Sequence, residues 1–205
     1  MKDIGEMVSA QRRFFTSGKT IDISFRTRQL GLLHHAVKEN EKMITDALHA
    51  DLRKSAYEAY LTEIGIVYED IRFYMKKTAR WARPRRVRTP FYHLPASSWI
   101  YPEPYGLSLI ISPWNYPFQL AIAPLAAAIS AGNCAMVKPS EFSVHTSEVM
   151  ADLIKQYFDP EYIAVVTGAV ETSKALLAEK FDKIFFTGSP GLGRSVMTAA
   201  ANHLI

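Results

Sequence analysis

The sequence predicts an α/β fold in which a doubly wound parallel sheet follows a set of N-terminal helices. Short apolar runs that suit buried strands alternate with helical patterns from residue 105 to the end of the 205-residue chain. Continuous apolar runs fit strands buried on both faces, as parallel sheets require, and polar, turn-forming residues close each run. Before residue 89, apolar residues recur at helical spacing instead.

Composition and charge restrict the class of protein. A hydrophobic content of 48% and a charged content of 21% are ordinary for a globular chain, and no apolar run is long enough to span a membrane. Residues 1–18 lack the apolar core of a signal peptide, so we expect no secretory leader. The single cysteine, Cys134, excludes an internal disulfide framework and a cysteine-built zinc site. A cytoplasmic location is the simplest prediction.

Residues 1–88 form the predicted N-terminal helical region. The first helical pattern covers Ile4–Phe15. A second begins at Ser24, which we expect to cap it, and runs to about Leu52 with a break near Asn40. Both patterns place apolar residues on one face, so these helices should pack on the sheet that follows.

A third helix is predicted from the capping-box sequence Ser55–Glu58 to a stop before Pro84, with Tyr60 and Leu61 on its apolar side. Seven basic residues and no acidic one occur in Lys76–Arg88. A nucleic-acid patch is one interpretation of this run. A solvated helix end, where cations oppose the negative end of the helix dipole, is the favoured one.

In residues 89–104, the side chains alternate loosely between the two faces expected of a strand, and proline residues interrupt the pattern. This pattern predicts a two-stranded arm with its turn near Pro95–Ser98. A lone hairpin is marginal in water, so the arm should pack on another surface.

A βαβ crossover begins the predicted sheet. Leu107–Ile111 is an apolar strand, and Gln119–Ala131 is apolar nearly all round, as in a buried helix that ends at Gly132. Cys134–Val137 is the second buried strand. Strand, helix and strand within about 35 residues are typical of this unit.

The alternation of strand and helix then continues to the end of the sequence. Two more strands are predicted, at Tyr162–Val166 and Lys183–Phe186. Helices are predicted at Thr146–Phe158, Ser173–Lys180 and Gly193–Leu204. The repeating unit calls for another strand next, so the sheet should be incomplete at its C-terminal end.

Two patterns resemble functional motifs but lack required partners. Gly188–Ser195 nearly spells the phosphate loop of nucleoside triphosphatases, yet Arg194 stands where that motif needs lysine. What remains is a helix start whose free N–H groups attract phosphate. His34 and His35 are adjacent, so they point in different directions on a helix, and we predict no metal site.

Asn115, Lys138 and Glu141 follow the ends of two predicted strands. In an open parallel sheet, ligands bind beyond the carboxyl ends of the strands. Asn115 suits a turn, and its amide also suits a hydrogen bond to a developing oxyanion. Lys138 and Glu141 are typical of a surface ion pair, or of residues that form hydrogen bonds with sugar hydroxyls. These residues by themselves indicate a nucleotide-binding α/β domain.

Three segments resemble successive signatures of the aldehyde dehydrogenase superfamily, in the family's order and spacing. They are Pro113–Phe118, Gly132–Glu141 and Phe185–Gly193. Tyr101–Gly106 and Met197–Ala201 are most similar to the class 3 branch. The resemblance covers essentially the whole chain and less than half of a typical family member.

The resemblance implies oxidation of aldehydes to carboxylic acids through a cysteine thiolate that forms a thiohemiacetal, with NAD or NADP as hydride acceptor. Asn115 would supply the side-chain half of the oxyanion hole. The other assigned residues would contact the cofactor: Lys138 and Glu141 at the adenine ribose, Trp114 and Ser189 along the pyrophosphate, Gly188 at the nicotinamide end and Gly168 near the adenine.

The resemblance also implies a domain organisation. Residues 105–205 would be a Rossmann-like NAD(P)-binding domain, and residues 89–104 would be the oligomerisation hairpin of a homodimeric full-length enzyme. Glu141 should repel the 2′-phosphate of NADP, yet class 3 members often accept both cofactors, so cofactor choice stays open. The identity of the aldehyde also stays open.

The nucleophilic cysteine and the general-base glutamate of the family are expected beyond residue 205. Cys134 stands at the amino end of its strand, about 13 Å from Lys138 at the rise of a strand. We therefore interpret Cys134 as a small buried apolar residue. The chain alone is predicted to be inactive.

Three interpretations of function remain open. The favoured one is the N-terminal part of an NAD(P)-dependent aldehyde dehydrogenase, with a small aldehyde as its partner and no nucleic acid. The second is a non-catalytic dinucleotide-binding or interaction remnant. The third is a basic nucleic-acid-binding module that uses Lys76–Arg88.

Overall fold

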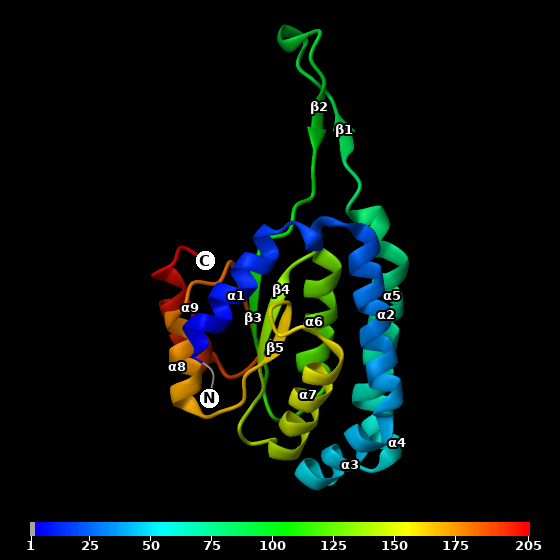
Figure 1. The fold of residues 1–205 in the computed structure, drawn as a ribbon, viewed down its shortest axis with the longest axis vertical. Coiled ribbons are helices and arrows are strands. Elements are labelled where there is room, and N and C mark those ends of the chain that lie inside the picture. Colours follow the sequence, from blue (N-terminus) through cyan, green and yellow to red (C-terminus); the bar gives the residue numbers. More distant parts are fainter. Residues whose placement is uncertain (1–2) are drawn as a thin grey trace.

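The computed structural model describes residues 3–205, so the first two residues of the predicted helical region lie outside it. In this range, a four-stranded parallel sheet lies between two groups of helices, and a two-stranded arm extends from one end (Figure 1). The predicted α/β class is confirmed. Over the same range, no helix combines the length and the apolar character that crossing a membrane requires.

The N-terminal region is helical, as predicted, with a break at Asn40. Its first elements are α1 (Ile4–Thr16), the 3₁₀ turn η1 (Lys19–Ile21), α2 (Ile23–Glu39) and α3 (Glu41–Leu52). The prediction that Ser24 caps the second helix is wrong by two residues. Asp22 is the cap, because its carboxylate accepts a hydrogen bond from the Ser24 amide at 2.9 Å.

The third predicted helix contains a π-helical turn. It comprises α4 (Ala56–Ala59), the π turn η2 (Tyr60–Ile64) and α5 (Gly65–Trp81). Ser55 caps it as predicted, accepting from the Glu58 amide at 3.1 Å. The wider turn shifts the register of the helix faces, so Tyr60 and Leu61 are exposed, contrary to the prediction, while Glu63 is buried.

The arm is built from β1 (Arg85–Val87) and β2 (Ser98–Ile100), which pair antiparallel, with a 3₁₀ turn η3 (Phe91–His93) between them. The turn predicted near Pro95–Ser98 is correct for residues 95–97, which lie between the two strands, and wrong for Ser98, which pairs with Val87. The first strand also lies before the expected start of the arm at residue 89. Proline has no N–H for a strand ladder, so the proline-rich residues form the tip instead.

The parallel sheet has the strand order β5-β4-β3-β6. Its strands are β3 (Leu107–Ile111), β4 (Cys134–Lys138), β5 (Ile163–Val165) and β6 (Lys183–Phe186). The order reverses between β3 and β6, which makes the sheet doubly wound. The predicted bounds of β3 and β6 are correct, whereas β4 ends one residue later than predicted and β5 is one residue shorter at each end.

Helices cover both faces of the sheet. They are α6 (Gln119–Ala131), α7 (Val144–Tyr157), α8 (Val170–Ala178) and α9 (Pro190–Ala201). In Figure 1, α6 and α7 lie on one face of the sheet, with α2 and α5 packed beside them on the side away from the sheet, and α1, α8 and α9 lie on the other face. Helix α6 has the predicted bounds and ends at Gly132, which is in the left-handed conformation with φ 87°.

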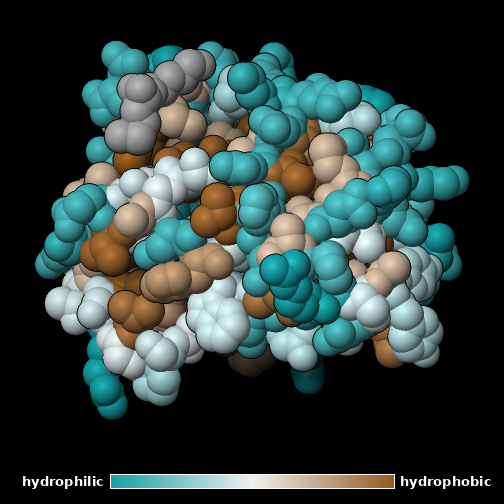
Figure 2. Space-filling view, turned by 90° about the horizontal axis from the view of Figure 1, so that it is seen from below, coloured by the Kyte–Doolittle hydropathy of each residue, from teal (hydrophilic) through white to brown (hydrophobic). Residues whose placement is uncertain are grey.

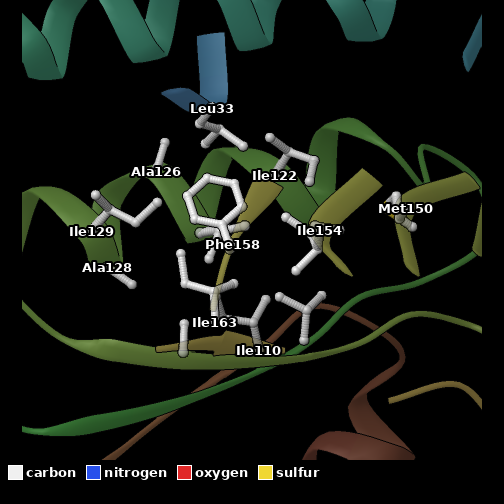
Figure 3. Packing of buried hydrophobic residues seen from close by; sticks show 14 of the residues in the cluster. Leu33, Ile110, Ile122, Ala126, Ala128, Ile129, Met150, Ile154, Phe158 and Ile163 are labelled. Carbon is white, nitrogen blue, oxygen red and sulfur yellow. The ribbon is translucent and has the colours of Figure 1, made fainter. Parts of the chain in front are cut away.

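The hydrophobic core joins the N-terminal helices to the sheet. Figure 3 shows Leu33 of α2 above Ile122 and Ala126 of α6, with Ile110 of β3 and Ile163 of β5 below them. All of these side chains are essentially buried. The N-terminal helices therefore form a second layer on the sheet rather than a separate body.

Candidate functional site

The carboxyl edge of the sheet gathers the ends of three neighbouring strands. Ile111 of β3 lies in register with Lys138 of β4 on one side and with Phe186 of β6 on the other. Because the strands are parallel, the residues that follow these three positions all leave the sheet at the same edge. Asn115, Lys138, Glu141 and Ser189 therefore belong to one end of the molecule, as predicted.

Lys138 and Glu141 form an ion pair at this edge, with 2.7 Å between Nζ and Oε2. The Lys138 side chain is 3% exposed and that of Glu141 is 29% exposed. Burial is the largest single effect and opposes ionisation of Glu141, but the hydrogen bond from Lys138, a backbone hydrogen bond and the positive charge of Lys138 together outweigh it, so the pKa of this carboxyl lies below its ordinary value. The pair is neutral overall, and its more exposed partner, Glu141, presents an ionised carboxylate at the end of β4.

A cavity of about 220 Å³ lies beside this pair. Glu141 and Gly168 both line it, together with Pro139, Ser147 and Thr167. Gly168 has φ 147°, and a Cβ there would lie 2.1 Å from Thr172 Oγ1. Glycine is therefore required at this turn, because both the positive φ and the contact with Thr172 disfavour any side chain. The structure thus brings together two of the predicted cofactor residues.

Gly188 and Ser189 lie between β6 and α9 and are exposed. The Ser189 side chain caps α9 by accepting from the Leu192 amide at 3.4 Å, and Pro190 occupies the first turn. The helix therefore starts three residues earlier than predicted. The hydroxyl of Ser189 is engaged by its own helix, while the N–H groups of the first turn lie at the exposed edge.

Trp114 and Asn115 lie in the loop between β3 and α6, and both side chains are exposed. The Asn115 side chain has no hydrogen-bond partner in the described part of the chain, whereas its backbone carbonyl accepts from Lys54 Nζ at 3.1 Å. The amide of Asn115 is therefore free to donate to a group bound at this edge.

Lys54 and Glu63 are site residues that the sequence did not reveal. They come from the N-terminal helical region, and both contact the loop that carries Asn115. The one sequence signal is an acidic residue, Glu63, next to the buried apolar residues Ile64 and Val67. A carboxylate in such a place needs a buried partner.

Cys134 is fully buried at the amino end of β4, and its burial raises the pKa of the thiol to about 12. At neutral pH it is a thiol, not a thiolate, and it lies at the opposite end of β4 from the carboxyl edge. Among residues 3–205, no group of three or more His, Cys, Asp or Glu side chains is arranged to hold a metal ion.

Figure 2 views the molecule from the end opposite the arm, where the strands end. Hydrophobic side chains, in brown, are exposed there between hydrophilic ones, in teal. A surface of this mixed kind suits a ligand with both apolar and polar parts.

Comparison with known proteins gives the same family over the whole chain. The family model for the aldehyde dehydrogenase family matches residues 1–205. The 4,4′-diaponeurosporen-aldehyde dehydrogenase of Staphylococcus aureus is 45% identical over 194 residues, which cover 95% of this chain and 42% of that protein. A dimeric, NADP-preferring aldehyde dehydrogenase of Canis lupus familiaris is 40% identical over 204 residues, covering 100% of this chain and 45% of that protein.

Solved structures agree with this assignment. A substrate-bound Staphylococcus aureus AldH superimposes with a TM-score of 0.97 and 43% identity, covering 100% of this chain and 45% of that one. A betaine aldehyde dehydrogenase of the same organism, in complex with NAD⁺, gives a TM-score of 0.84 and 25% identity, covering 96% and 40%. This chain therefore spans less than half the length of these relatives. It belongs to the aldehyde dehydrogenase family.

Proposed function

We propose that this chain is the cofactor-binding part of an enzyme that oxidises aldehydes to carboxylic acids with NAD or NADP. Family membership supports aldehyde oxidation. The observation that carries the proposal is the carboxyl edge, where Ile111, Lys138 and Phe186 end three strands in register. Dinucleotides bind at such an edge, next to the point where the strand order reverses.

The residues at this edge fit a nicotinamide dinucleotide. The cavity lined by Glu141 and Gly168 lies beside the carboxyl end of the sheet, where the adenine ribose of such a cofactor is proposed to bind. Ser112, which follows β3, has a buried hydroxyl without a partner among residues 3–205. The bound NAD⁺ of the betaine aldehyde dehydrogenase and the NADP preference named for the canine relative support the same class of cofactor. Such a cofactor accepts a hydride.

Each assigned residue has a task that follows from its position. Glu141, held ionised by Lys138, accepts hydrogen bonds from ribose hydroxyls. The N–H groups at the start of α9, after Gly188 and Ser189, attract the pyrophosphate, with Trp114 beside it. Asn115 donates its side-chain amide to the aldehyde oxygen as that oxygen gains negative charge.

We propose that the nucleophile and the general base of the enzyme lie outside residues 1–205. Cys134 is buried and its pKa is about 12, so it supplies no thiolate. The chain alone is therefore proposed to bind cofactor without turnover. The arm of β1 and β2, with Phe91 and Tyr92 exposed at its tip, is the proposed dimer contact of the full-length enzyme, and a reducing cytoplasm is its proposed location.

Two measurements test this proposal. NADH binding to the purified chain is followed by fluorescence, and NADH production is followed with a panel of aldehydes. We expect binding without turnover from the chain alone. Joined to the C-terminal half of the Staphylococcus aureus relative, the chain should turn over, and Asn115→Ala should lower kcat about 10²–10³-fold. Failure to bind either cofactor would overturn the proposal, whereas binding with no turnover in the fusion would favour a non-catalytic dinucleotide-binding module.

A further inference from the structure

A buried ion pair lies directly behind the loop that carries Asn115. Lys54 Nζ and Glu63 Oε1 are 2.5 Å apart, and their side chains are 8% and 0% exposed. Removing two charges from water is costly, and their mutual attraction offsets that cost only when the remaining hydrogen-bonding groups also find partners. The other partners of this pair therefore indicate why it is there.

Among residues 3–205, the remaining partners of the two side chains all lie in residues 115–119, which comprise part of the loop between β3 and α6 and the first residue of α6. Lys54 Nζ donates to the backbone carbonyl of Asn115 at 3.1 Å and lies 4.1 Å from the centre of the Tyr116 ring. Glu63 Oε2 accepts from the backbone amides of Phe118 and Gln119 at 2.9 and 3.1 Å. These two amides start α6, where the helix dipole favours a negative charge. The pair thus forms hydrogen bonds both with the middle of the loop and with its junction with α6.

The π turn of Tyr60–Ile64 brings Glu63 into this place. The extra residue in the turn rotates Glu63 onto the buried face of the helix, while Tyr60 turns outward. Gly65 permits the turn, because a Cβ there would lie 2.9 Å from the Tyr60 carbonyl oxygen. π turns frequently occur at functional sites.

We propose that Lys54 and Glu63 are positioning residues that hold Asn115 ready to donate to the substrate oxygen. The proposal rests on the proposed function, because it assigns the pair a task through Asn115. Hydrogen-bond donors that stabilise a developing charge act best when they are already in place, and a displacement of about 1 Å costs about 10²-fold in rate. The exposed side chain of Asn115 has no hydrogen bond among residues 3–205 that would hold it in position. Its position therefore depends on its backbone, which the hydrogen bond from Lys54 fixes.

The first experiment tests the structural half of the proposal on the chain itself. Amide hydrogen exchange is compared in the parent, Lys54→Met and Glu63→Gln. We expect faster exchange confined to residues 113–120. The matched control is Lys42→Met. It removes an exposed ion pair, in which Lys42 Nζ lies 2.6 Å from Asp46 Oδ2, and it should leave the hydrogen exchange of this loop unchanged. Unchanged exchange of the loop in both test variants would overturn the proposal, whatever the role of Asn115.

The second experiment is a double-mutant cycle in the fusion with the catalytic half. Lys54→Met should lower kcat about tenfold or more and leave KM for NAD within about twofold, since the pair contacts the loop and not the cofactor cavity. Combined with Asn115→Ala, Lys54→Met should have no further effect on kcat, because it acts through Asn115. Equal losses in both backgrounds would reveal a merely structural role and overturn the proposal.

A conservative variant distinguishes the loss of this interaction from a loss of folding. Lys54→Arg keeps the charge and a donor, so it should retain the fold and recover at least part of kcat. If Lys54→Met unfolds, Glu63→Gln takes its place in the cycle, because glutamine still accepts from the two α6 amides. If Asn115→Ala leaves kcat unchanged while loop exchange responds to Lys54→Met, the proposed function of Asn115 fails and the anchoring of the loop stands.

Discussion

Glu141→Gln should change the choice between NAD and NADP. The carboxylate is held ionised by Lys138 at 2.7 Å and borders the cavity that contains Gly168. It is proposed to accept hydrogen bonds from the adenine ribose, and a negative charge there repels a phosphate on the 2′-oxygen. Glutamine keeps the shape and one acceptor oxygen and removes only the charge.

The magnitude follows from the change in charge. A hydrogen bond to an ionised group contributes about 1.5–3 kcal/mol and a neutral one about 0.5–1.5 kcal/mol, so NAD should lose about 1.4 kcal/mol, or tenfold in affinity. Removing the repulsion should give NADP a gain of about 1 kcal/mol at this partly exposed position. The ratio of the two affinities should therefore shift by about 30–100-fold toward NADP.

The assay is titration of the chain with NADH and NADPH, read by fluorescence. Glu69→Gln is the matched control, because Glu69 pairs with Arg72 at the same i, i+3 spacing, 3.0 Å apart, on an exposed face of α5. It should leave both affinities unchanged. An unchanged ratio in Glu141→Gln would refute the reasoning that places the ribose at this carboxylate.

Three further predictions concern stability and reactivity. Gly168→Ala should destabilise the fold by about 1–3 kcal/mol, because its Cβ would clash with Thr172 Oγ1, whereas Gly191→Ala, with nothing within 4 Å, should stay within about 0.5 kcal/mol by denaturant unfolding. Cys134 should resist thiol reagents at about pH 8 in the native chain and react after unfolding, since the pKa of its thiol is about 12; rapid native labelling would contradict this. The lowered pKa of Glu141 stabilises the folded chain above the unfolded pKa of this carboxyl. That contribution is lost as pH falls through the folded pKa, so the Tm difference between the parent and Glu141→Gln should shrink between about pH 7 and pH 3.

The sheet and its helices could be predicted because local patterns and buried packing agree there. Leu107–Ile111 and Lys183–Phe186 are exact, and so is α6, where an apolar surface all round, a buried place in the fold and Gly132 at the end all favour the same helix. Chain order and parallel pairing then place Asn115 and Ser189 at one edge without further information.

The exact strands of the arm and the π turn could not be predicted from the same patterns, although the existence of a two-stranded arm could. Both strands of the arm are only three residues long, and the first lies within a basic run that also suits a helix end. The π turn changes the helical period by one residue, so a period of 3.6 assigns Tyr60 and Leu61 to the wrong face. The pairing of Lys54 with Glu63 depends on that turn, which is why the N-terminal helices showed no chemistry in the sequence.

The most direct test of the cofactor-binding edge is amide hydrogen exchange of the chain with and without saturating NAD⁺. The account predicts protection in residues 138–148, 166–172 and 187–193, which are the segments that follow β4, β5 and β6. It predicts no change at the tip of the arm, residues 88–97. Protection absent from all three segments, or found only elsewhere in the chain, would contradict it.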